Sequence, residues 1–93
     1  MLDEIRRREL RLFEGVREVL FREWDPIGVN NQPLSQDEYD SYARRIVGYL
    51  NEETDEYKIA HYLSEVQRNS MGMSNIDGDN NRRIARRLLE LKR

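Results

Sequence analysis

Residues 2–26 read LDEIRRRELRLFEGVREVLFREWDP, and this stretch decides the fold. Its apolar residues recur at steps of three, four and seven, which is the spacing of one face of an α-helix. The stripe consists of Leu2, Ile5, Leu12, Val16, Val19 and Leu20, and only Glu9 interrupts it. Because the residue before a proline is pushed out of the α region, we expect this helix to cover roughly residues 2–23 and to end near Trp24-Asp25-Pro26.

The same helical spacing returns three times after the turn-rich residues 25–33. Ser35 and Glu38 match a capping box, and Thr54 is followed by two acids that favour the positive end of a helix dipole. The later helices are predicted over roughly residues 36–51, from Thr54 to about Asn69, and over about 80–92. Each helix has a single apolar stripe to bury, so we expect an all-α fold, a compact single-domain bundle of about four helices covering residues 1–93.

The composition excludes several classes of protein. The chain has 93 residues, of which 38% are hydrophobic and 37% charged, and it has no cysteine. This length excludes a two-domain dinucleotide-binding enzyme, and the lack of cysteine excludes disulfides, thiol nucleophiles and thiolate metal sites. The sequence shows neither a membrane-spanning apolar run nor the apolar segment of a signal peptide. We therefore expect a cytoplasmic protein with no cofactor and no membrane partner.

Charge is unevenly distributed along the chain. Residues 34–69 carry eight acids and four bases, whereas residues 70–93 carry three acids and six bases. The basic residues of the last helix include Arg82, Arg83, Arg86 and Arg87, at steps that place them along one flank. A sequence pI near 5.5 argues against a nucleic-acid partner, because such binders usually have a basic excess. We interpret this flank as a solvated face partly paired with Glu90 and with acids of the first helix, the alternative being a surface for RNA or anionic lipid.

The acidic middle of the chain carries the candidate partner-binding residues. Asp25, Asp37 and Asp40 could form an acidic rim that meets a basic partner, although Asp25 could instead cap a turn and Asp37 could complement the helix dipole. Four further acids at the junction of the second and third helices are expected to face water. The predicted binding residues are Asp25, Asp37, Asp40, Glu52, Glu53, Asp55 and Glu56, together with Tyr49.

The aromatic residues divide between core and surface. Trp24 is the sole tryptophan and lies beside a chain reversal, so we expect its ring to be buried against the first two helices. Tyr39 and Tyr42 fall at core-facing spacing in the second helix. Tyr49 and Tyr62 are the tyrosines that we expect to be exposed and available to a partner.

Two patterns that suggest catalysis or metal binding are incomplete. His61 is the only histidine, and no serine or cysteine stands in an elbow motif that could use it as a general base. Residues 77–81 begin like a calcium loop, but Arg82 and Leu88 occupy the positions that need glycine and glutamate. Helix capping by Asp77 or Asp79 explains these residues better.

Several motifs together resemble a known group of proteins. They are Glu23-Trp24-Asp25-Pro26-Ile27-Gly28-Val29, then Asp37-Glu38-Tyr39-Asp40-Ser41-Tyr42 and Arg45-Ile46-Val47, with weaker similarity at Glu65, Met71-Gly72 and Arg83-Ile84-Ala85. The chain resembles small bacterial domains of the YugE-like kind, whose function is unknown. The resemblance implies a compact helical bacterial protein and transfers no catalytic residue. In size and acidity the chain is also similar to immunity proteins that neutralise toxins.

These observations favour a protein-binding module without catalysis, most concretely a toxin-neutralising immunity-type protein that presents its acidic surface to a basic enzyme. Two alternatives stay open. One is a small enzyme or ligand-binding domain built on the Trp24–Val29 loop, with Asp25, Asp40 and His61 as its polar groups. The other is a homo-oligomeric structural protein assembled through the first helix.

Overall fold

The computed structural model describes residues 2–24 and 39–92, and in these ranges it contains helices and no strand. Helix α1 (Leu2–Val19) continues into a π-helical turn, η1 (Leu20–Trp24). Helix α2 (Asp40–Asn51) follows, and α3 (Glu56–Glu65) continues into a second π-helical turn, η4 (Val66–Ser70), before α4 (Gly78–Glu90). The predicted all-α fold of about four helices is confirmed. The capping box at Ser35 and Glu38 lies outside the described residues.

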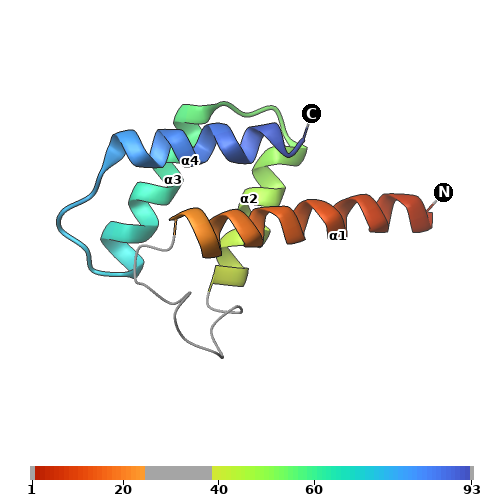
Figure 1. The fold of residues 1–93 in the computed structure, drawn as a ribbon, viewed down its shortest axis with the longest axis horizontal. Coiled ribbons are helices and arrows are strands. Elements are labelled where there is room, and N and C mark those ends of the chain that lie inside the picture. The colour runs from red at the N-terminus through yellow and green to blue at the C-terminus, as the bar shows by residue number, and fades with distance from the viewer. Residues whose placement is uncertain (1, 25–38, 93) are drawn as a thin grey trace.

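The helices pack as two pairs that share one core. α3 lies against α4, α1 lies against α2, and both α1 and η1 also contact α4. Figure 1 shows α1 and α4 running across the view, with α2 and α3 crossing them. Each helix buries one apolar stripe between the pairs. The buried hydrophobic residues are Val16, Val19, Leu20, Trp24, Tyr39, Ala43, Ile46, Leu50, Ile59, Ala60, Leu63, Val66, Ile84, Ala85 and Leu88.

Two aspartates determine where the last two helices begin. The Asp55 carboxylate accepts a hydrogen bond from the Lys58 backbone N–H at 2.9 Å, and that of Asp77 accepts one from the Asn80 N–H at 3.0 Å. Asp55, rather than the expected Thr54, is therefore the cap of α3. Capping by Asp77 is confirmed, and it starts α4 at Gly78, two residues before the predicted boundary.

A polar network at Asn81 joins η1, α3 and η4 to α4. The Trp24 Nε1–H donates to the Asn81 Oδ1 at 3.0 Å. The Asn81 amide nitrogen donates in turn to the Ser64 Oγ at 2.9 Å and to the Gln67 Oε1 at 2.7 Å. The Trp24 ring is 5% exposed and its centroid lies 5.6 Å from that of Tyr39. Burial of Trp24 is confirmed, but its hydrogen-bond partner lies on α4 and not on the first two helices.

Replacement of Asn81 by alanine should therefore destabilise the fold strongly. The change leaves the buried Trp24 N–H and the Gln67 side chain without their partner, and we expect a loss of about 3 kcal/mol in the free energy of unfolding. Urea denaturation followed by circular dichroism measures this loss. Asn75→Ala, at an exposed position, is the control and should change stability by less than about 0.5 kcal/mol. Equal stabilities of the two variants would contradict the role given to the network.

Candidate functional site

Four of the predicted binding residues lie together in one surface depression, which we call the acidic depression. It has a volume of about 650 Å³ and lies between the α2–α3 connection and the C-terminal part of α4. Its lining consists of Leu50, Glu52, Glu53, Thr54, Asp55, Glu56, Tyr57, Arg86, Leu89 and Lys92. The structure therefore brings the acids of residues 52–56 together around a partly apolar floor.

The four carboxylates of the acidic depression have different surroundings. Asp55 caps α3, and the Glu56 carboxylate pairs with the Arg86 guanidinium at 3.1 Å with only 25% of its side chain exposed. Glu52 and Glu53 are exposed, and neither is in an ion pair with any residue that the structure describes. Asp55 is exposed as expected, although it also caps α3. The expected exposure is wrong for Glu56, which is partly buried where it joins α3 to Arg86 of α4.

The bases beside the acidic depression are already engaged. Arg86 is held by Glu56, and the Lys92 Nζ donates to the Asn51 Oδ1 at 2.9 Å. Four acids face two bases here, so the depression carries a net negative charge. Glu52 and Glu53 are the carboxylates that remain available to a cation from outside.

Asp40 belongs to a different part of the surface. It begins α2, whereas the acidic depression follows the end of α2, and a helix of this length separates the two by about 17 Å. The Asp40 Oδ1 lies 2.9 Å from the Arg17 Nε, and 18% of the Asp40 side chain is exposed. The prediction of one acidic surface that includes Asp40 is therefore wrong. Asp25 and Asp37 lie outside the described residues.

Tyr39 is buried and Tyr42 packs against the core, as predicted, but the two tyrosines that we expected to be exposed are not. Tyr49 and Tyr62 are half-buried and pack edge to face, with ring centroids 5.4 Å apart. Burial raises the pKa of the Tyr62 hydroxyl above its ordinary value. The expected exposure of this pair is wrong. The exposed tyrosine is Tyr57, 63% accessible, which lines the acidic depression.

The position of Tyr57 could have been found in the sequence. It precedes the buried Ile59 by two residues, and two residues correspond to about 200° around a helix. Such a residue faces away from the core. Placed in the first turn of α3 between two acids and Lys58, it is suited to contact a partner.

The basic flank of α4 is paired as predicted. Arg87 lies 3.2 Å from Glu23 and 3.0 Å from Glu90, and Arg83 lies 3.7 Å from Glu23. Arg82 pairs with Asp79 in the preceding turn. These contacts raise the pKa values of Arg82 and Arg87, chiefly through side-chain hydrogen bonds to their acids. The arginines of the basic flank therefore form ion pairs, some within α4 and some with Glu23 of η1.

The other sites considered from the sequence have few functional features. The His61 side chain is 76% exposed, and its Nε2 lies 3.9 Å from the Glu65 carboxylate. Across residues 2–24 and 39–92, no three potential metal-ligating side chains of the His, Cys, Asp or Glu type are grouped. Among the described helices, none is both long and apolar enough to cross a bilayer.

Comparisons with known protein families, with curated proteins and with solved structures find no match for this chain. The resemblance to YugE-like domains stays a prediction. The feature of the described residues that suggests a function is the acidic depression, with its exposed carboxylates and exposed tyrosine.

The two roles within the acidic depression can be separated by mutation. Asp55→Ala removes the cap of α3 and should lower the free energy of unfolding by about 1 kcal/mol. Glu53→Ala removes an exposed carboxylate without a described ion pair and should leave stability within about 0.5 kcal/mol. Thermal or urea unfolding of the two variants tests the difference. A loss at Glu53 as large as that at Asp55 would show that Glu53 has a structural role.

Proposed function

We propose that this chain is a non-catalytic protein-binding module whose acidic depression receives a basic surface of its partner. The observation that carries the proposal is the placement of Glu52 and Glu53 beside the exposed ring of Tyr57. Tyrosines frequently contribute the largest binding energies at protein interfaces. Exposed carboxylates attract a cationic partner and orient its approach, which raises the association rate.

The most concrete form of this function is that of an immunity-type protein in bacteria. Enzymes that act on nucleic acids present basic residues around their active sites, because the phosphate backbone dominates their affinity. A small acidic protein can cover such a site with carboxylates that stand in for phosphates. In this chain Glu52 and Glu53 would supply the charges, and Tyr57 with Leu89 would supply the apolar contact.

The enzymatic alternative receives less support. Asp40 is held by Arg17, His61 faces Glu65, and the Trp24 N–H is used in the core. Asp25 and the rest of the Trp24–Val29 loop lie outside the described residues. The groups named for catalysis therefore have stabilising contacts of their own.

Charge reversal at the acidic depression should slow binding without unfolding the protein. The partner is captured from cells that make the chain, identified, and studied by association kinetics at low and high salt. For Glu52→Lys with Glu53→Lys we expect an association rate about tenfold lower at low salt, and a weaker dependence on salt. The unfolding transition should be nearly unchanged, because exposed charges contribute little to stability.

A matched control changes the same amount of charge elsewhere. Glu14 lies on the exposed side of α1 and Asp79 in the first turn of α4, so Glu14→Lys with Asp79→Lys alters net charge equally. This variant should retain most of the wild-type association rate. Equal rates for wild type and the Glu52/Glu53 variant would remove the acidic depression from the proposed function.

The proposal also predicts a negative result at His61. His61→Gln should leave partner binding and biological activity within a few-fold of wild type, because this side chain is 76% exposed and does not line the acidic depression. Partner inhibition or protection assays measure this. Loss of activity in a correctly folded His61→Gln protein would favour the enzymatic alternative.

A further inference from the structure

A second hollow, which we call the basic groove, lies beside the N-terminal half of α1. It has a volume of about 480 Å³ and is bounded by α1, the last residue of α2 and the C-terminal end of α4. Its apolar walls are Ile5, Leu12 and Leu91, and its bases are Arg8, Arg11 and Lys92. A concave site of this size, in which apolar walls accompany a few polar groups, is typical of small-molecule binding.

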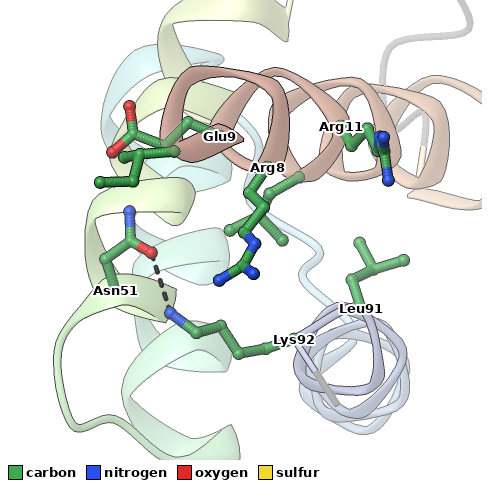
Figure 2. A pocket seen from close by; sticks show the side chains of 8 residues that line it. Arg8, Glu9, Arg11, Asn51, Leu91 and Lys92 are labelled. Carbon is green, nitrogen blue, oxygen red and sulfur yellow. Dashed lines mark hydrogen bonds between the residues drawn. The ribbon is translucent and has the colours of Figure 1, made fainter. Parts of the chain in front are cut away.

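Two cations approach the basic groove from opposite sides. Arg8 lies seven residues before Gly15, on the same side of α1, and a Cβ at Gly15 would lie 3.3 Å from the Leu91 side chain. Arg8 therefore faces the end of α4, and Figure 2 shows its side chain extending from α1 towards Lys92. The Lys92 Nζ donates to the Asn51 Oδ1 at 2.9 Å, which holds the ammonium group at the groove.

The positive charge of the basic groove is not neutralised by the described residues. The Asn51 amide, which bonds to Lys92, carries no charge. Arg8 and Arg11 are in no ion pair within residues 2–24 and 39–92. Glu9 is the one acid of the described lining, and Figure 2 shows its carboxylate extending in a different direction from the Arg8 side chain. An anion bound between the converging cations would relieve their mutual repulsion.

We propose that the basic groove binds a single-chain anionic amphiphile, with its carboxylate or phosphate head between Arg8 and Lys92. A guanidinium binds either head through two parallel hydrogen bonds, and the ammonium group adds a second cation. The apolar chain lies against Ile5, Leu12 and Leu91, which removes apolar surface of both molecules from water.

The shape of the basic groove favours a free amphiphile over the surface of a bilayer. Leu12 and Leu91 are partly buried against the core, so they are recessed between α1 and the end of α4. A helix that lies in a membrane surface instead inserts a projecting apolar face among the lipids. The first turn of α1 also carries Asp3 and Glu4, which would repel anionic lipid.

The basic groove can be tested separately from the acidic depression. Lys92 borders both hollows, whereas Ile5 and Arg8 line the basic groove alone. Variants at these two positions leave the carboxylates proposed for protein binding unchanged. Loss of amphiphile binding with partner binding retained, or the reverse, therefore shows which of the two proposals fails.

Titration of the isotope-labelled full chain with decanoate and with decyl phosphate, below their micelle concentrations, tests the site by NMR. The anionic probes should bind saturably and shift the amide signals of Arg8, Leu12 and Asn51. Decyltrimethylammonium has the same chain with a cationic head, and butyrate has the carboxylate with a shorter chain. We expect each of these two to bind about tenfold more weakly or less, because each lacks one of the two kinds of contact.

Variants on α1 test the head and chain contacts. Arg8→Glu should lower the association constant for the anionic probes about tenfold, because an acid replaces a cation of the head site. Ile5→Ser should lower it about threefold through lost apolar contact. Arg7→Glu is the matched control, since it changes the net charge equally at an exposed position that does not line the groove. All three positions are exposed, so circular dichroism should show that the variants fold.

Several results would overturn the proposed site. One is equal binding of decanoate and decyltrimethylammonium, and another is equal weakening by Arg8→Glu and Arg7→Glu. Failure of both anionic probes to bind would overturn it as well. That holds even if the chain sediments with phosphatidylglycerol vesicles, or if Arg8→Glu abolishes capture of a protein partner, because the groove would then serve a membrane or a protein instead.

Discussion

The side chain of Asn81 holds the two pairs of helices in register. Its amide accepts from Trp24 of η1 and donates to Ser64 of α3 and Gln67 of η4; the contacts to Trp24 and Gln67 are buried, and that to Ser64 is partly buried. Burying an unpaired amide or indole N–H would destabilise the fold by several kcal/mol. Here the indole N–H bonds to the Asn81 oxygen and the Asn81 amide nitrogen bonds to Gln67, so this desolvation cost is offset. Both Trp24 and Gln67 lie in π-helical turns. Such turns change the rotation of the residues in them, which brings these two side chains onto one asparagine.

The surfaces of the molecule follow from this arrangement. With η1 held against α4, the axis of α1 is set, and its N-terminal half extends beyond the other helices. Gly15 permits a close approach at the far end of α4, because a Cβ there would lie 3.3 Å from the Leu91 side chain. Leu91 and Lys92 are thereby placed beside α1, and Lys92 also borders the acidic depression. The end of α4 therefore separates two hollows of opposite charge.

Local signals in the sequence were sufficient for the helices but not for their contacts. Apolar spacing predicted the four described helices, and turn chemistry predicted a cap at Asp77 or Asp79, of which Asp77 is the one observed, because both signals depend on residues within a few positions of each other. The pairs Arg17–Asp40 and Glu56–Arg86 join residues 23 and 30 positions apart, which no spacing rule reveals. Asn81 stands in the first turn of a helix, where asparagine is ordinarily exposed, so nothing local marked it as buried. Tyr49 and Tyr62 were misassigned for the same reason, since each is covered by the other.

The separations of the Asn81 contacts along the chain also imply an order of folding. Gln67 and Ser64 lie 14 and 17 residues away, whereas Trp24 lies 57 residues away. Closing the longer loop costs about 1 kcal/mol more in chain entropy. The α3–η4–α4 half can therefore assemble early around the Gln67–Asn81 hydrogen bond. α1 then docks later, when the Trp24 N–H bonds to the Asn81 oxygen that is already in place. Pulse-labelled hydrogen exchange during refolding would then protect the amides of α3 and α4 before those of α1, and the opposite order would exclude this route.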